Sequence, residues 1–259
     1  MYKEHPTFEA PEDKNIKVWR YMDVTKFISL LHTRALFFSR SDKLGDPFEG
    51  SYPLGNADRR LSAYYGYDRF PGIYHKLREW TTVSCWHINE TESDAMWKLY
   101  LSSNEGIAIQ STFKRLANSF KKVEQDVFIG KVKYIDYETQ TIPEVKHLGD
   151  AFYPFLYKRN SFEHERELRA IVQEIPLKRV KNQWDKYEYH PDMSEKGVTY
   201  GKAIPIELGH LVERIYVSPA SPTWVKEVIE SLIKKYRLKK PIIQSELIKD
   251  PFFDWSEMT

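Results

Sequence analysis

The stretch from Lys158 to Val172 constrains the fold of this chain most strongly, because it places charged side chains on a strand pattern. From Glu167 onward, apolar and charged residues alternate with the period of two that is typical of a β-strand. Even-numbered positions from Leu168 to Val172 form an apolar face, while Glu167 and Arg169 lie on the other face. We therefore expect a strand that packs one face in a core and turns its charged face elsewhere.

Short strand patterns and helix patterns alternate irregularly along the rest of the chain. The strand patterns cover Ile16–Tyr21, Arg34–Ser39, Thr81–Trp86, Gly106–Gln110, Val127–Ile135, Ala203–Leu208, Arg214–Ser218 and Pro241–Leu247. The helix patterns cover Val24–Leu31, Glu92–Leu101, a short segment ending at Phe120, Glu144–Tyr157 and Val225–Tyr236. Not every strand is followed by a helix, and no repeat or linker divides the chain. We expect a single compact α+β domain over residues 15–259, with a mixed, mostly antiparallel sheet flanked by helices.

Several boundaries follow from capping residues and from changes in pattern. Asp23 is expected to cap the first helix, and Ser221 the last one, with Pro222 at its first helical position. The stretch near 51–80 is rich in tyrosine and arginine, and we expect it to form a helical insertion. Lys178–Gly197 has no clear period and is expected to be a surface excursion.

Composition excludes several classes of protein. Hydrophobic residues make up 41% of the 259 residues and aromatic residues 15%, which indicates a buried core rather than a disordered chain. The formal net charge of +2 gives no strong overall attraction to nucleic acid or to an anionic membrane. Cys85 is the single cysteine, so an intramolecular disulfide framework and a cysteine-rich zinc site are both excluded.

The compartment is predicted from the same features. A single cysteine fits a reducing interior, and no apolar run approaches the length of a membrane span. Residues 1–14 contain no apolar signal core. We therefore expect a cytoplasmic protein without a membrane partner, in which residues 1–14 form a flexible leader.

The motifs of several common enzyme folds are missing. The sequence contains no GxGxxG, GxxxxGK[ST], HExxH or GxSxG, which removes the usual support for dinucleotide-fold, P-loop, zincin and α/β-hydrolase activities. The polar and aromatic residues that could take part in catalysis or binding gather instead in four clusters. These are Trp19-Arg20-Tyr21, Asp46-Pro47-Phe48-Glu49, Cys85-Trp86-His87 with Met96-Trp97, and Lys158 with Phe162, Glu165, Glu167 and Arg169.

The order of these clusters resembles that of a known bacterial family. After the short strand that carries Arg20 come the segments FFSRSDKLGDPFEG, SCWHINETESDAMWKLYLSSNEGIAI and KRNSFEHERELRAIV. Together they resemble the family called domain of unknown function 2971, over about residues 17 to 175. That family has no settled activity, so the resemblance bears on the extent of the domain more than on its function.

A looser resemblance is to the ADP-ribosyltransferases, which have a compact α+β fold. It implies three catalytic positions, namely Arg20 on an early strand, Ser84 on a middle strand and Glu167 beside a later one, with Glu165 completing a Glu-x-Glu pair. NAD would be the substrate, and no resident metal is expected. Cleavage of the nicotinamide–ribose bond builds positive charge on the sugar, which a carboxylate stabilises, and a guanidinium suits the phosphates of the nucleotide.

Further residues are candidates for substrate binding. Aromatic rings suit stacking on the nicotinamide, and polar residues of the same clusters supply contacts. The substrate-binding candidates are Tyr21, Asp46, Trp86, His87, Trp97, Lys158 and Arg169. The substrate is expected to be a nucleotide or a nucleic acid.

Purely structural roles are the alternative for each candidate. Glu165, Glu167 and Arg169 can form neighbouring or cross-strand ion pairs, and Arg20 can pair with a surface acid. Trp97 has the helical spacing of a core residue. The sequence leaves these alternatives open, and convergence of the candidates on one cleft would favour catalysis.

Two other functions also stay open. Asp46, Glu49, Glu165 and Glu167 could bind magnesium or manganese for phosphodiester cleavage, as in a metal-dependent nuclease, because hard cations prefer carboxylate oxygens. The abundant tyrosine, tryptophan and arginine also fit a non-catalytic regulatory module that binds a protein partner, with the insertion near 51–80 as its contact surface.

Overall fold

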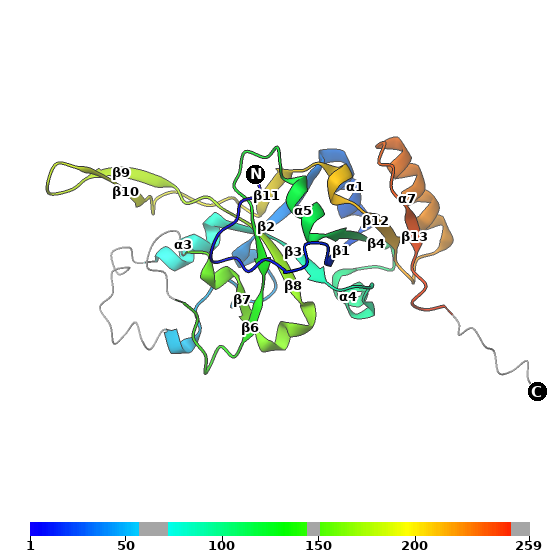
Figure 1. The fold of residues 1–259 in the computed structure, drawn as a ribbon, viewed down its shortest axis with the longest axis horizontal. Helices are drawn as coiled ribbons and strands as arrows, with labels where there is room; N and C mark the ends of the chain where they lie inside the picture. The colour runs from blue at the N-terminus through cyan, green and yellow to red at the C-terminus, as the bar shows by residue number, and fades with distance from the viewer. Residues whose placement is uncertain (57–71, 144–150, 250–259) are drawn as a thin grey trace, which may run out of the picture.

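The computed structural model describes residues 1–56, 72–143 and 151–249, and it confirms the α+β class (Figure 1). Within these residues, nine strands form one large mixed sheet, in which most neighbours are antiparallel. Its strands are β1 (Lys17–Asp23), β2 (Ala35–Arg40), β3 (Thr81–Ile88), β4 (Gly106–Thr112), β5 (Phe128–Lys131), β8 (Glu167–Gln173), β11 (Gly201–Pro205), β12 (Arg214–Val217) and β13 (Ile242–Gln244).

The sheet runs in the order β11-β2-β3-β1-β4-β12-β13, and β8 adds a branch because it pairs with both β3 and β5. Only the β12–β13 pair of this sheet is parallel among the described pairs. Two small two-stranded sheets lie outside it. They are the parallel pair β6 (Lys133–Ile135) and β7 (Tyr157–Arg159), and the antiparallel pair β9 (Leu177–Lys181) and β10 (Tyr187–Pro191).

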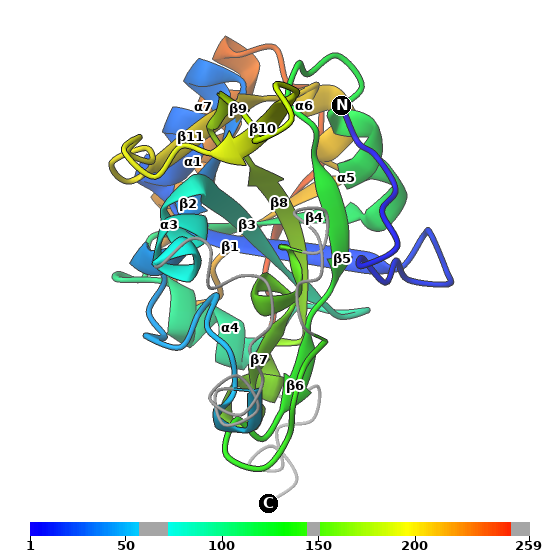
Figure 2. The same ribbon diagram turned by 90° about the vertical axis from the view of Figure 1, so that its left-hand side faces the viewer.

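Strand β3 is the branch point of the large sheet. One of its edges pairs with β8 from Thr81 to His87. The other edge is shared, since β2 pairs with it at Val83 and β1 pairs with it at His87. Strands β1 and β2 therefore diverge along this edge, and the middle residues of β3 have neither of them as a neighbour (Figure 2).

Helices cover both faces of the sheet. The described α-helices are α1 (Val24–Thr33), α3 (Ile73–Trp80), α4 (Asp94–Tyr100), α5 (Phe113–Ser119), α6 (Leu208–Leu211) and α7 (Thr223–Lys235). Apolar residues of α1, α5 and α7 form the largest core on one face, together with Leu168, Ala170 and Val172 of β8. A second core lies under α3, and a third packs α4 against β1. The apolar face predicted for β8 is confirmed.

Most predicted strands are present with small shifts of their ends, but two predictions in the middle of the chain are wrong. The single strand expected over Val127–Ile135 is two strands, because β5 pairs with β8 while β6 pairs with β7. The helix expected over Glu144–Tyr157 lies partly outside the described residues, and its described part contains only a 3-10 turn at Tyr153–Phe155. Pro154 in this turn cannot continue a helical hydrogen-bond ladder.

The two helix caps differ from the prediction in detail. Asp23 is the N-cap residue of α1, but its carboxylate accepts hydrogen bonds from Ser102 instead of from its own helix. Helix α7 begins at Thr223, one residue later than predicted, so Pro222 is the cap itself. The hydroxyl of Ser221 donates to the carbonyl of Asn104, which explains why it does not cap the helix.

The first residues pack against the domain, which corrects the expectation of a flexible leader. Tyr2 forms a parallel bridge with Val127, and Phe8 is buried in the core under α3. A Cβ atom at Gly130 would lie 3.1 Å from the backbone of Phe8, so the glycine permits this close approach. The helical insertion expected near 51–80 lies partly outside the described residues, and α3 is the described helix within it. In the described ranges, we find no helix with the length and apolar character needed to cross a membrane.

Candidate active site

A cleft of about 790 Å³ lies where β1 and β2 diverge from β3. Its lining brings together the five residues whose convergence the catalytic hypotheses require, namely Arg20, Asp46, His87, Glu165 and Glu167. Tyr21, Trp86, Lys158 and Arg169 line it as well. Most of the predicted site residues therefore surround one space.

Pairing between β3 and β8 explains one wall of the cleft. Cys85 lies opposite Arg169, and His87 lies opposite Glu167. Residues that are directly opposite in a sheet share a face, and so do residues two positions apart along a strand. The alternation read from the sequence therefore places these four side chains on the same surface, away from the large core.

Arg169 is saturated by interactions within the protein. Its side chain is 1% exposed and forms a bidentate pair with Glu49, with both N–O distances at 2.8 Å. It also donates to Glu167 at 2.6 Å and to the carbonyl of Phe155 at 2.9 Å. Burial alone would lower the pKa of Arg169, but the charges of Glu167 and Glu49 hold it well above the ordinary value. This arginine is a fixed part of the wall.

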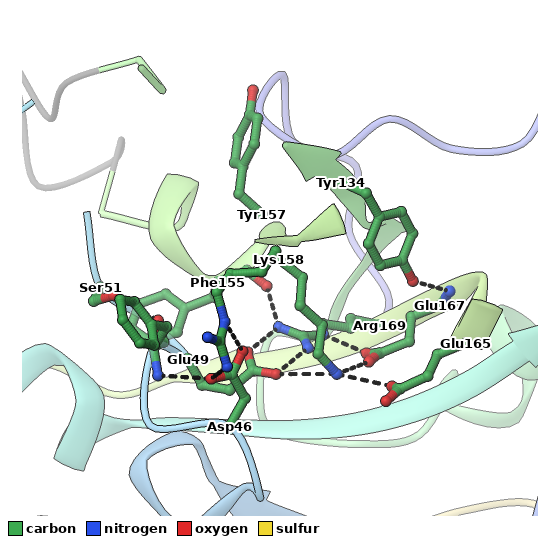
Figure 3. A network of polar contacts seen from close by, with 12 residues as sticks. Asp46, Glu49, Ser51, Tyr134, Phe155, Tyr157, Lys158, Glu165, Glu167 and Arg169 are labelled. Atoms are coloured by element: carbon green, nitrogen blue, oxygen red, sulfur yellow. Dashed lines mark hydrogen bonds and ion pairs between the residues drawn. The ribbon is translucent and has the colours of Figure 1, made fainter. Parts of the chain in front are cut away.

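Lys158 contacts the carboxylates of Glu49 and Glu167, which also pair with Arg169, and that of Glu165 (Figure 3). Its Nζ lies 2.8 Å from Glu165, 2.7 Å from Glu167 and 3.4 Å from Glu49. The ring of Phe162 covers the ammonium group at 4.4 Å. Burial lowers the pKa of Lys158, but the nearby carboxylates outweigh that effect and raise it, so the lysine is charged at neutral pH.

Glu165 and Glu167 share Lys158 but differ in protonation. Burial, together with the neighbouring Glu167, raises the pKa of Glu165 to about 7. Burial acts in the same direction on Glu167, but Arg169 and Lys158 hold its pKa well below the ordinary value. Three carboxylates here face two cations, so ionisation of all three would leave one negative charge without a cationic partner. Glu165 is the member that retains a proton near neutral pH.

The backbone explains why Glu165 reaches this cluster. Glu165 precedes β8 and ends a 3-10 helix, Asn160–Glu165. Arg166 follows with a left-handed φ of 41° before β8 begins. This turn, and not strand alternation, directs the Glu165 carboxylate toward Lys158 beside that of Glu167.

His87 is neutral and has a defined tautomer. Its Nδ1 lies 2.7 Å from the carbonyl oxygen of Glu165, which can only accept, so Nδ1 carries the proton. Nε2 is then the unprotonated nitrogen. Burial is the largest effect on the pKa of His87, and it lowers this pKa. The imidazole can therefore accept a hydrogen bond from a ligand.

Arg20 lines the same cleft as Arg169, but it has different contacts. It donates to the hydroxyl of Ser84 and to the carbonyl of Phe37, and its guanidinium lies 5.9 Å from the ring centre of Trp86. It thus spans the gap between β1, β2 and β3. In the parts of the chain that the structure describes, no carboxylate pairs with it, and burial lowers the pKa of this guanidinium.

Asp46 is held by a third arginine at the rim. Arg159 approaches it at 2.7 Å, and the Asp46 carboxylate also accepts from the backbone of Phe48. The guanidinium of Arg159 lies 4.3 Å from the ring centre of Phe48. Arg159 was not among the predicted site residues, because the pairing joins positions that are 113 residues apart.

Two predicted site residues do not line the cleft. Ser84 is fully buried, and its hydroxyl accepts a hydrogen bond from Arg20. Trp97 packs edge-on against Tyr21 at a centroid distance of 4.9 Å, and its indole N–H donates to Glu92. The helical spacing of Trp97 indicated this core role. Its place on the cleft wall is taken by Tyr100, one turn further along and 39% exposed.

The carboxylates of the cleft are not arranged as a metal site. No group of three histidine, cysteine, aspartate or glutamate side chains suited to a metal occurs within residues 1–56, 72–143 and 151–249. The four acids proposed as ligands are instead paired with Lys158, Arg159 and Arg169. This arrangement favours the nucleotide hypothesis over the metal-dependent nuclease.

Comparison with known proteins does not assign this chain to a family. No protein-family model matches the chain, and a search of curated proteins finds no match. The resemblances described from the sequence therefore stay predictions, and the site itself must carry the functional argument.

Proposed function

We propose that this protein is an enzyme that binds NAD, or another nucleotide, in the cleft and cleaves a bond at the anomeric carbon of its ribose, as ADP-ribosyltransferases do. One observation carries the proposal. Among the described residues, a guanidinium that pairs with no carboxylate lines the same cleft as three carboxylates that face only two cations. A nucleotide with a negative diphosphate and a positive nicotinamide ring matches both features.

Arg20 is the residue that binds the diphosphate. A guanidinium presents a planar set of donors that matches phosphate oxygens, and such charge-assisted hydrogen bonds are stronger than neutral ones. Ser84 and Phe37 use part of this donor set and fix the side chain in the gap. The remaining donors are directed to a ligand, because no carboxylate among the described residues competes for them.

The acidic cluster stabilises positive charge on the substrate. Cleavage of the nicotinamide–ribose bond leaves an oxocarbenium-like sugar, and a carboxylate beside the anomeric carbon lowers the energy of that state. Glu167 suits this role less well than the sequence suggests, since both of its oxygens are held, one by Lys158 and one by Arg169. We therefore assign the reacting carboxylate to Glu165, which contacts Lys158 through one oxygen and otherwise shares a hydrogen bond with Glu167.

The protonation of Glu165 sets a pH dependence. A pKa of about 7 leaves a mixture of its acid and carboxylate forms at neutral pH. Only the ionised form stabilises a cationic sugar, so turnover rises as the pH increases from 6 to 8. Lys158 and Arg169 hold the neighbouring Glu167 ionised throughout this range.

Incubation with NAD and measurement of released nicotinamide test the proposal. Glu165→Gln is expected to lower the rate by roughly 100-fold or more, because it removes the negative charge that stabilises the positive charge developing on the ribose in the transition state. Glu163→Gln is the matched control, since Glu163 belongs to the same 3-10 helix and is exposed. Cooperative thermal unfolding of each variant above the assay temperature excludes loss of folding as the cause.

Two results would overturn the proposal. One is a folded wild-type protein that releases no nicotinamide from NAD and no base from other nucleotides. The other is a Glu165→Gln variant that is as active as the wild type.

A further inference from the structure

The β9–β10 ribbon stands apart from the large sheet and projects from the body of the domain (Figure 1). All five residues of β9 are exposed. The sequence indicated only a surface excursion here, because Lys178–Gly197 is charged and aromatic without a clear period. A two-stranded ribbon without a core needs another reason for its aromatic content.

Strand register sorts the side chains of the ribbon onto two faces. Tyr187 lies opposite Lys181, and Tyr189 lies opposite Arg179. Cross-strand partners and residues two positions apart share a face, so these four side chains form one surface. We call it the aromatic face. Glu188 lies opposite Val180, and therefore on the other side.

The aromatic face is exposed, and its arginine already lies over one of its tyrosine rings. Tyr189 is 66% exposed, and Trp184 at the tip of the ribbon is 70% exposed. The guanidinium of Arg179 lies 3.5 Å from the ring centre of Tyr187. Exposed rings and guanidinium groups offer flat surfaces on which further planar groups can stack.

Charge favours an anionic occupant. Residues 177–191 contain four lysines and arginines against two acids, so the ribbon has a net charge of +2, equal to that of the whole chain. On the aromatic face itself, Arg179 and Lys181 are the charged members. The acid that contacts this face is Asp185 in the turn, which holds Lys181 at 2.7 Å.

We propose that the aromatic face of the β9–β10 ribbon, together with Trp184 at the tip, binds single-stranded nucleic acid, with bases stacked on Tyr187, Tyr189 and Trp184 and phosphates on Arg179 and Lys181. Tyrosines two positions apart along a strand are separated by about 7 Å, which an extended single strand can span from base to base. A duplex hides the flat sides of its bases, so the rings favour a single strand. This proposal does not depend on the chemistry of the cleft.

Fluorescence anisotropy with labelled oligonucleotides tests it on the full-length chain. The probes are a 12-nucleotide oligo(U) RNA, an oligo(dT) DNA of the same length and a DNA duplex, each at 50 and 200 mM KCl. We expect the wild type to bind the single strands more tightly than the duplex, with weaker binding at the higher salt concentration. A preference between RNA and DNA identifies which of the two the ribbon recognises.

Variants connect the binding to the ribbon. Trp184→Ala and Tyr189→Ala are each expected to raise Kd by roughly 5- to 100-fold, because stacking of one base contributes about 1–3 kcal/mol. Trp224→Ala is the matched control, since Trp224 is also exposed, at 51%, but lies on α7. Arg179→Gln is expected to make the plot of log Kd against log salt concentration less steep, by the amount that corresponds to about one phosphate contact.

Several results would overturn the proposal. These are no binding of either single strand at 50 mM KCl, equal loss of binding in Trp224→Ala, and duplex binding as tight as single-strand binding. Vesicles containing anionic phospholipid are an additional probe, and binding to them without binding to oligonucleotides would identify a membrane surface instead.

Discussion

Arg169 and Arg20 line the same cleft, both from strands, but their surroundings are opposite. Arg169 makes hydrogen bonds to Glu49, Glu167 and a carbonyl, and little of it reaches solvent. Arg20 contacts a hydroxyl, a carbonyl and an indole ring, with no acid beside it in the described residues. The first arginine holds the wall of the cleft together, and the second has binding capacity left for a ligand.

This difference also separates stability from function. A buried charge whose partner is removed is strongly destabilising, because the remaining charge stays away from water. A charge that has no ionic partner leaves none behind when it is replaced. Changes at the Arg169 end of the cleft should therefore affect folding, while changes at the Arg20 end should affect binding.

The largest effect is expected for Arg169→Met. This change leaves Glu49 and Glu167 buried with only Lys158 for compensation, so we expect the free energy of unfolding to fall by about 3–5 kcal/mol. Urea unfolding at pH 7 measures it. A loss below about 1 kcal/mol would show that the cluster contributes little to stability. It would contradict the claim that Arg169 holds the wall of the cleft together.

A smaller effect is expected in the pH dependence of stability. Folded Glu165 keeps its proton up to pH about 7, whereas the unfolded chain releases it near the ordinary value of 4.5. The folded state therefore binds more protons in this window, and the contribution of Glu165 to stability is complete below pH 4.5 and lost as the pH rises through 7.

Glu165→Gln removes this titration, and unfolding curves at pH 5 and pH 8 measure the result. The stability of the variant relative to the wild type should increase from pH 5 to pH 8, in a range where Glu167 stays ionised. A difference that does not change with pH would mean that Glu165 titrates normally in the folded protein.

The smallest effect on stability is expected for Arg20→Gln. No carboxylate in the described residues loses its partner, so the free energy of unfolding should change by less than about 1 kcal/mol. The same urea unfolding experiment at pH 7 gives the direct comparison with Arg169→Met. Equal losses in the two variants would contradict the distinction between the two ends of the cleft.

The sequence predicted the strand that carries the site but not the contacts that define it. Period two placed Glu167 and Arg169 on one face of β8, and the structure confirms that face. The pairing of Arg169 with Glu49 spans 120 residues and follows from tertiary packing. A local pattern holds no information on such a pair.

The contrast between the two arginines could not be predicted from the sequence for the same reason. Both stand on strands beside aromatic or apolar residues, and the divergence of β1 and β2 places Arg20 in a gap where no carboxylate of the described residues pairs with it. The ribbon was missed because its alternation contains no apolar face. The helix expected before Tyr157 was wrong because helical spacing was given more weight than Pro154.

Isothermal titration of ADP-ribose into the wild type, Arg20→Gln and Arg214→Gln tests the central claim most directly. Arg214 is an exposed strand arginine and serves as the matched control. We expect the wild type and Arg214→Gln to bind with equal affinity, and Arg20→Gln to bind roughly 10- to 100-fold more weakly, as expected for loss of a hydrogen bond to a charged group. Absence of binding to the wild type, or equal affinity in Arg20→Gln, would contradict the assignment of Arg20 as the phosphate-binding residue of a nucleotide cleft.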